Sequence, residues 1–261
     1  FLRRGRTRYV NVMERRLIEL EGAVNFRDIG GYRAGARGRT RWRRVYRSDS
    51  LAELTPADLQ RLRELDLYGI SDFRLPSERA KKPDRLPEGH AMRLLTPGFI
   101  PRGTEDMLRE VSMGRLDAAA IRAEVTRHYR LFAAEHLGEY VSTFRMILEA
   151  GGRPVLLHCT SGKDRTGFGV ALLMLAAGCD EATVAEDYLM TNSHRRDIAF
   201  MFSGEVDPAA IEMLTAAHPE YIATALAVLR QTHGAPDDWL RAMGFNAEER
   251  ARLRVLLTEP A

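Results

Sequence analysis

One segment, residues 158–167, contains the side chains best suited to catalysis. Its sequence is His-Cys-Thr-Ser-Gly-Lys-Asp-Arg-Thr-Gly, with a thiol at Cys159 and a guanidinium six residues later at Arg165. A cysteine thiolate is a strong nucleophile, and a planar guanidinium can bind two oxygens of one phosphate group. The spacing therefore predicts a loop in which Cys159 attacks phosphorus while Arg165 binds the phosphate oxygens through the transition state.

The sequence on both sides of the segment predicts the elements that position it. The run Val155–His158 is typical of a buried strand, and an apolar helix is expected through Phe168 and Leu175. A loop between a strand and a helix directs several backbone N–H groups, and the positive end of the helix dipole, into one concavity. We therefore expect an anion-binding loop in which the thiolate form of Cys159 is favoured.

The other residues of the loop are expected to bind the substrate. Lys163 adds a second cation, Gly162 removes a side chain where the backbone approaches the ligand, and Thr166 can donate a hydrogen bond to the thiolate. The backbone of residues 160–164 would supply the amide groups. The predicted substrate-binding residues are Thr160, Ser161, Gly162, Lys163 and Thr166.

Two aspartates are candidates for the general acid that protonates the leaving group and later activates water. Asp72 ends a predicted strand, and strand ends surround the crevice of an open α/β sheet. Asp164 lies inside the loop itself, where it would be protonated or paired with Lys163 or Arg165. Both aspartates remain catalytic candidates on this evidence.

Several nearby residues are expected to support the site without taking part in the chemistry. His158 directly precedes the nucleophile, so we expect it to orient the loop rather than act as a base. Arg74 and Glu78 are expected to pair and shape the loop after their strand. Cys179 has no cationic neighbour, so we expect an inert thiol. Cys159 then has no obvious resolving cysteine, and its oxidation should inactivate the protein.

Strands and helices alternate along the chain, which predicts an α/β fold with a mostly parallel central sheet flanked by helices. Strands are predicted at residues 70–73, 92–95 and 155–158, and helices from Thr55-Pro56 and through 104–150 with breaks near Gly114 and Gly138. Predicted N-caps of later helices are Asp180, Asp207, Asp237 and Asn246. We predict one domain, residues 20–258, after a basic N-terminal extension, residues 1–19.

The loop and further segments resemble the bacterial tyrosine and lipid phosphatases. The loop matches the family's His-Cys-x-x-Gly-Lys-Asp-Arg-Thr-Gly pattern. The other matching segments, in chain order, are residues 25–32, 46–48, 67–70, 72–74 with Glu78, 187–189 with Asn192, 219–221 and 239–257. The resemblance therefore covers about residues 20–258.

This resemblance implies a protein tyrosine phosphatase-like α/β fold with a helical, lid-like insertion. It also implies a cysteine-dependent phosphatase that works through a phosphocysteine intermediate without a metal or other cofactor. Phosphotyrosine, phosphoserine or phosphothreonine, and phosphoinositides are substrates within such families, and the Lys163-Asp164 pair is usually associated with lipid phosphates. The tract that forms a mobile cover in the family here contains Met107, Leu108, Val111 and Met113. These side chains would equally suit a helix packed on the core.

Composition excludes several other classes of protein. The 261 residues are 45% hydrophobic and 29% charged, which is typical of a globular protein rather than a disordered one. Two cysteines exclude a disulfide framework, and no apolar stretch approaches the roughly 18 to 20 residues that a membrane span needs. We expect a cytoplasmic, monomeric protein without stable membrane insertion. Export stays open because residue 1 is Phe.

The basic residues are almost all arginines, since lysine occurs only at positions 81, 82 and 163. Residues 33–47 contain seven arginines and no acidic residue. Without an interleaved aromatic pattern for stacking on bases, we interpret this run as a solvated turn and strand face rather than a nucleic-acid-binding surface. The basic surplus would then attract phosphorylated substrates.

A second class of function stays open, a non-catalytic module that binds phosphorylated ligands without turnover. The presence of both Cys159 and Arg165 argues against it. A sulfurtransferase or an arsenate reductase could use a similar loop, but arsenate reduction would need a nearby resolving cysteine.

Overall fold

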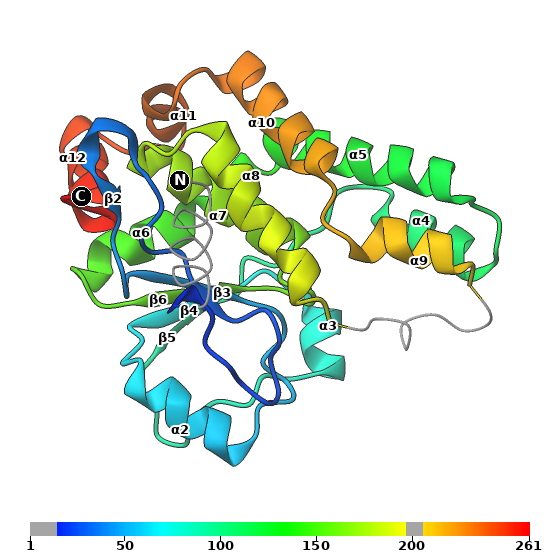
Figure 1. Cartoon of the computed structure of the whole chain (residues 1–261), viewed down its shortest axis with the longest axis horizontal. Coiled ribbons are helices and arrows are strands. Elements are labelled where there is room, and N and C mark those ends of the chain that lie inside the picture. The colour runs from blue at the N-terminus through cyan, green and yellow to red at the C-terminus, as the bar shows by residue number, and fades with distance from the viewer. Residues whose placement is uncertain (1–14, 197–205) are drawn as a thin grey trace, which may run out of the picture.

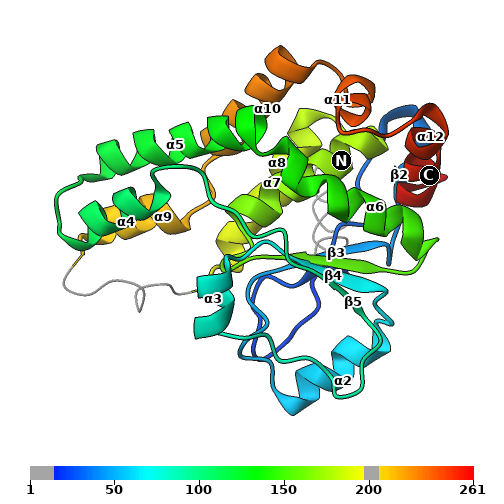
Figure 2. The same ribbon diagram turned by 180° about the vertical axis from the view of Figure 1, so that it is seen from behind.

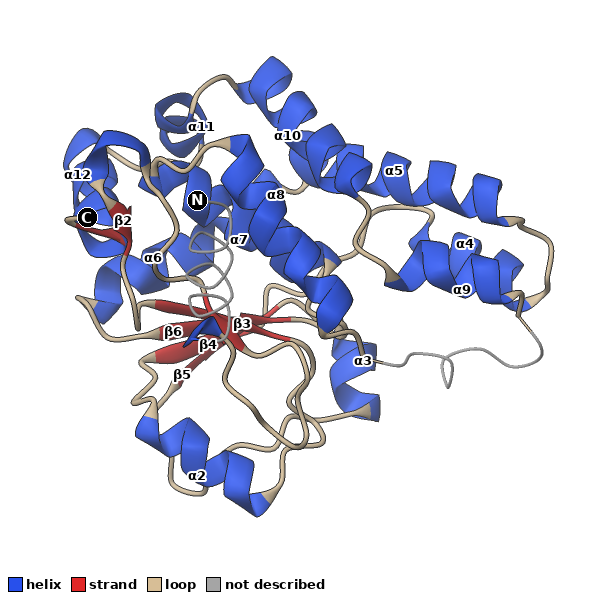
Figure 3. Cartoon of the chain, viewed as in Figure 1, coloured by secondary structure: helices blue, strands red, loops and turns tan. Residues whose placement is uncertain are grey.

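A five-stranded sheet runs through the centre of the molecule, and helices lie on both of its faces (Figures 1 and 3). The structure, a computed structural model, describes residues 15–196 and 206–261. Most of the predicted N-terminal extension, residues 1–19, therefore lies outside the described residues. The strands, in spatial order, are β1 (Arg27–Asp28), β3 (Val45–Ser48), β6 (Val155–His158), β4 (Gly69–Asp72) and β5 (Arg93–Leu95).

The sheet is parallel except at one edge. Strands β3, β6, β4 and β5 are parallel, and β1 is antiparallel to β3. The predicted α/β class with a mostly parallel sheet is thus confirmed. Because Ser48 and Asp72 both pair with His158, the carboxyl ends of three neighbouring strands coincide, and Cys159 emerges between them. This edge is where open α/β sheets bind their ligands.

The helices form a layer on each face of the sheet. One face is covered by α2 (Pro56–Glu64) (Figure 1). On the other side lie α6 (Val141–Ala150), α7 (Asp164–Ala177), α8 (Glu181–Leu189), α11 (Pro236–Ala242) and α12 (Ala247–Leu257). Short 3₁₀ helices are η1 (Gly35–Arg37), η2 (Leu137–Tyr140) and η3 (Met190–Ser193), and a second small sheet pairs β2 (Arg39–Thr40) with β7 (Thr258–Glu259).

A group of helices extends beyond the carboxyl edge of the sheet (Figures 1 and 2). We call this group the arm, and it consists of α4 (Thr104–Ser112), α5 (Ala118–Glu135) and α9 (Pro208–Thr215). α5 contacts both other helices of the arm, and α10 (Pro219–His233) packs along it. α3 (Pro76–Lys81) lies at the same edge of the sheet, between the arm and α2.

Capping residues explain where several helices begin. Thr55 and Asp58 form a capping box at α2, and Asn246 forms one with Glu249 at α12. The predicted N-caps Asp180, Asp207 and Asn246 are confirmed. The prediction for Asp237 is wrong, because Pro236 occupies the first helical position of α11 and Ala235 is the N-cap.

Apolar side chains fill both interfaces of the sheet. The larger cluster lies between the sheet and α6, α7, α10 and α12, and Phe168 and Leu172 of α7 are fully buried in it. A smaller cluster lies on the other face of the sheet, where Leu62 of α2 packs with Tyr46 and Ile70 of the strands. The arginine run is not entirely a solvated face as predicted, because the side chain of Arg47 on β3 is fully buried.

Candidate active site

The predicted phosphate-binding loop connects β6 to α7, as the sequence indicated. Cys159 follows the strand directly and is 1% exposed, and α7 begins at Asp164. Gly162 has a φ of +67°, and a Cβ atom there would lie 2.5 Å from the carbonyl oxygen of Ser48. Glycine is therefore required by the close approach of β3 and by the left-handed backbone, and the predicted close approach of this backbone to a ligand stays a prediction.

A cavity of about 340 Å³ lies over the loop. The loop contributes Thr160, Ser161, Lys163, Asp164 and Arg165 to its lining. Across from them, the arm and the segment before it contribute apolar side chains, which include Ile100, Met107, Leu108, Val125 and Phe132. The cavity is thus polar at one wall and apolar at another, and it lies at the carboxyl edge of the sheet.

Arg165 is held by Glu78 of α3. Its Nη1 donates to Oε2 of Glu78 at 2.7 Å and to the carbonyl oxygen of Phe73 at 3.0 Å, and its Nη2 donates to Oε1 of Glu78 at 2.8 Å. Burial alone would raise the pKa of Glu78, but the hydrogen bonds and charge of Arg165 lower it to about 2. Nη2 also donates to Oγ1 of Thr160 at 3.4 Å, whereas Nε makes no hydrogen bond to a described residue and remains as a donor for a phosphate oxygen. The expected Arg74–Glu78 pair is wrong, since Arg74 binds other carboxylates.

Asp164, one of the two candidate acids, lines the cavity with a side chain that is 34% exposed. The hydroxyl of Tyr129 on α5 donates to its Oδ1 at 2.8 Å. Nζ of Lys163 lies 3.3 Å from the same oxygen. Sequence reasoning missed Tyr129, because it belongs to an apolar stripe of α5 that is typical of core packing.

Lys163 is turned toward the end of the arm. Its side chain is 1% exposed, and its ammonium donates to the carbonyl oxygens of Leu214 and Ala216, where α9 ends. Nζ also lies 5.7 Å from the centre of the Tyr221 ring. A cation is favourable at the C-terminal end of a helix, where carbonyl groups lack intrahelical partners.

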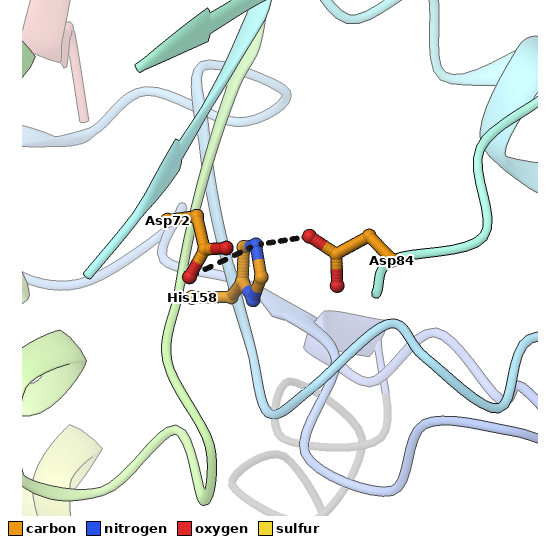
Figure 4. A group of neighbouring side chains, drawn as sticks. All are labelled: Asp72, Asp84 and His158. Carbon is orange, nitrogen blue, oxygen red and sulfur yellow. Dashed lines mark ion pairs between the residues drawn. The ribbon is translucent and has the colours of Figure 1, made fainter. Parts of the chain in front are cut away.

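Asp72, the other candidate acid, belongs to a buried cluster with Asp84 and His158 (Figure 4). Nε2 of His158 lies 3.2 Å from Oδ2 of Asp84 and 3.8 Å from Oδ1 of Asp72. Nη2 of Arg74 lies 2.8 Å from Asp72 and 2.7 Å from Asp84. These residue types could ligate a metal ion, but Arg74 already places a positive charge between the two carboxylates. Asp72 is not among the residues that line the cavity.

Buried charges behind the loop fix its backbone. Arg47 donates through Nη2 to the carbonyl oxygen of Gly162 at 2.5 Å and through Nη1 to Asp187 of α8. Arg27 of β1 pairs with the same carboxylate at 3.1 Å. Burial opposes the charge of Asp187, but the two arginines hold its pKa well below the usual range. The predicted family segments at residues 25–32 and 187–189 therefore meet at the loop.

The hydroxyl of Thr166 and the thiol of Cys179 are both buried. Oγ1 of Thr166 is buried and has no hydrogen-bond partner among the described residues, so the predicted bond to the thiolate stays a prediction. Cys179 is buried, and burial raises its pKa to about 12. The expectation of an inert second thiol agrees with this environment.

Comparisons with known proteins identify relatives along most of the chain. The Tyrosine phosphatase family profile matches residues 18–259. The triple specificity protein phosphatase PtpB of Mycobacterium tuberculosis is 31% identical over 274 residues, which cover 92% of this chain and 98% of that protein. A protein of Cupriavidus necator, named as a candidate tyrosine-protein phosphatase, is 31% identical over 243 residues, with 88% and 85% covered. The crystal structure of P. aeruginosa TpbA covers 78% of this chain and 88% of its own at 19% identity, with a TM-score of 0.39.

A helix that spans a membrane must be both long and apolar. Within residues 15–196 and 206–261, none is both long enough and apolar enough to cross a bilayer.

Proposed function

The chain belongs to the tyrosine phosphatase family and is a phosphatase, and from this premise we propose that it hydrolyses phosphomonoesters through a phosphocysteine intermediate. The observation that carries this proposal is the placement of Arg165. Its guanidinium is fixed by Glu78 beside the loop that begins at Cys159, and its Nε–H remains for a phosphate oxygen. No metal or other cofactor enters the proposed reaction.

In the first step, Sγ of Cys159 attacks phosphorus, and the bond between phosphorus and the leaving oxygen breaks. Arg165 and the backbone N–H groups of residues 160–164 bind the phosphate oxygens as charge develops on them. Asp164 gives its proton to the leaving oxygen. We assign the acid role to Asp164 rather than Asp72, because Asp164 lines the cavity and Asp72 is paired with Arg74.

In the second step, the carboxylate of Asp164 accepts a proton from a water molecule, and the oxygen of that water attacks phosphorus. The bond between phosphorus and Sγ breaks, inorganic phosphate leaves, and the thiolate returns. Thr166 would stabilise this thiolate with its buried hydroxyl, which has no other partner among the described residues.

The proposed substrates are phosphotyrosine and, more broadly, phosphoserine, phosphothreonine and phosphoinositides. A broad range is supported by the relative that is named a triple specificity phosphatase. It is also supported by the cavity, whose apolar wall from the arm suits the organic part of several phosphomonoesters.

The direct test is turnover of p-nitrophenyl phosphate by a Cys159→Ser variant. We expect its kcat to fall at least about 1,000-fold, because an alcohol is a far weaker nucleophile than a thiolate. Cys179→Ser is the matched control and should keep wild-type kcat, since this thiol is buried and held protonated. Wild-type turnover by Cys159→Ser would refute the mechanism. Binding of a phosphotyrosine peptide by the wild-type protein without turnover would instead support a non-catalytic module.

A further inference from the structure

The carboxylate of Asp164 is held at only one of its two oxygens. Oδ1 accepts a hydrogen bond from Tyr129 and lies near the ammonium of Lys163. No described residue is hydrogen-bonded to Oδ2. A protonated Asp164 would therefore carry its proton on Oδ2, because Oδ1 already faces two donors. Holding Oδ1 thus selects which oxygen can face the leaving group.

The hydroxyl of Tyr129 is itself fixed by a second tyrosine. The hydroxyl oxygens of Tyr129 and Tyr188 are 2.7 Å apart, and both side chains are buried. A hydroxyl has a single proton to donate. Because Tyr129 donates its proton to Asp164, Tyr188 must donate to Tyr129. The hydrogen bonds therefore run in one direction, from Tyr188 through Tyr129 to Asp164.

Burial keeps both hydroxyls protonated. It raises the pKa of Tyr129 and of Tyr188 well above the ordinary value for tyrosine, and the nearby charge of Asp164 acts in the same direction. Both groups therefore remain donors near neutral pH. The ring of Tyr129 is also fixed, since it stacks on Tyr221 with ring centres 5.5 Å apart.

We propose that Tyr129 is a positioning residue for Asp164 and that Tyr188 holds Tyr129 in place. The inference rests on the proposed role of Asp164 as the general acid. Tyr129 does not touch the reacting atoms, and it acts by directing Oδ2 toward the leaving oxygen. Proton transfer depends steeply on such alignment, because donor and acceptor must be within hydrogen-bonding reach.

Through Tyr129, α5 orients the general acid. α5 carries Tyr129, packs against α4 and α9, and supplies part of the apolar wall of the cavity through Val125 and Phe132. The same helix therefore contacts the space for the substrate and orients the acid. The acid is aligned only when α5 is seated against α8, the helix that carries Tyr188.

The test is a leaving-group series on Tyr129→Phe, measured as kcat/KM, which reports phosphocysteine formation. For phenyl phosphate and phosphotyrosine, poor leaving groups, we expect a loss of about tenfold or more. For p-nitrophenyl phosphate, a better leaving group that needs less protonation, we expect less than about threefold. Tyr188→Phe should show the same pattern with a smaller loss.

Tyr221→Phe is the matched control. Its hydroxyl donates to the carbonyl oxygen of Met213 in α9, and the residue is as buried as Tyr129, but it does not reach Asp164. The control removes one buried tyrosine hydroxyl from the same cluster, so its kcat/KM should change by the same factor for every leaving group. An equal loss for all leaving groups in both Tyr129→Phe and Tyr188→Phe would overturn the inference, because that pattern indicates general loosening of the site.

Asp164→Asn and Asp72→Asn separate this inference from the proposed function. The true acid shows the steepest dependence on the leaving group. If Asp72→Asn shows this steep leaving-group dependence and Asp164→Asn does not, the assignment of Asp164 as the acid is wrong, and so is the inference about Tyr129. If Asp164→Asn shows it and neither tyrosine variant does, only the inference fails. In the double variant Tyr129→Phe/Asp164→Asn, the tyrosine change should cost no further leaving-group sensitivity, because the two residues act as a unit.

Discussion

Arg165 enters the reaction with most of its guanidinium already engaged. Glu78 binds it in a bidentate arrangement, and the carbonyl oxygen of Phe73 accepts a further hydrogen bond. An arginine side chain has many rotamers in water, and fixing one of them costs conformational entropy. The ion pair with Glu78 fixes that rotamer when the protein folds, so a phosphate binds to a guanidinium that is already oriented.

Glu78→Gln should therefore weaken phosphate binding and catalysis together. We expect kcat/KM for p-nitrophenyl phosphate to fall about 10- to 100-fold, since a small displacement of the clamp is enough for such a loss. Glu135→Gln, which removes an exposed carboxylate paired with Arg102, is the control and should change little. An unchanged kcat/KM in Glu78→Gln would show that Arg165 holds its position without this carboxylate.

The ends of β4 and β6 are linked by contacts between a histidine and carboxylates as well as by backbone pairing. Asp72 ends β4, His158 ends β6, and Asp84 reaches both from the segment after α3. Burial alone would lower the pKa of His158, but Asp84 and Asp72 outweigh it and raise the pKa. The charged form of His158 is therefore favoured where three segments meet, immediately before the nucleophile.

This cluster predicts a pH dependence of stability. A histidine whose pKa is raised by folding stabilises the protein fully below its unfolded pKa of about 6.5, and this contribution is lost as pH rises through the folded pKa. Asp84→Asn should lower the free energy of unfolding by about 2 kcal/mol near pH 6 and by less at alkaline pH. Denaturant unfolding across this range measures the difference, with the exposed Glu149→Gln as control. A loss that is equal at all pH values would contradict the coupling.

In the molecule as a whole, a buried lysine of the phosphate loop anchors the C-terminal end of α9 in the arm. Lys163 reaches from the loop to the carbonyl groups that end α9, and a buried ammonium needs such partners. A residue that sequence analysis assigned to substrate binding thus also has a structural contact, with the end of α9.

Lys163→Met should loosen α9 in the substrate-free protein. The methionine keeps the apolar length but leaves the carbonyl oxygens of Leu214 and Ala216 without their donor, at a cost of about 1 to 3 kcal/mol. We expect faster amide hydrogen exchange across residues 208–215. Lys82→Met, which removes an ammonium from a surface pair with Glu53, should leave that exchange unchanged. If Lys163 acts only on the substrate, exchange in α9 will stay at the wild-type rate.

The sequence predicted the loop and the sheet because both depend on local patterns. The apolar run before Cys159, the glycines and the N-caps act over a few residues, and the family resemblance placed Glu78 near the site. The partners of buried charges could not be predicted in this way. Arg27 and Asp187 are 160 residues apart, and Tyr129 meets Asp164 across 35 residues. An arginine in a basic run gives no local sign that it will be buried, and a tyrosine in an apolar stripe gives no direction for its hydroxyl.

The buried Arg47–Asp187 pair also has a consequence for the order in which the protein is made. The two residues are 140 positions apart, so at a synthesis rate of about 5 to 20 residues per second the carboxylate follows the guanidinium by on the order of 10 s. Cys159 is synthesised 28 positions before Asp187, so for about 1 to 6 s at the end of that interval the nucleophile is present while the backbone of Gly162 lacks its anchored donor. The loop that carries Cys159 is therefore synthesised before α8, whose carboxylate completes the anchor of the loop backbone.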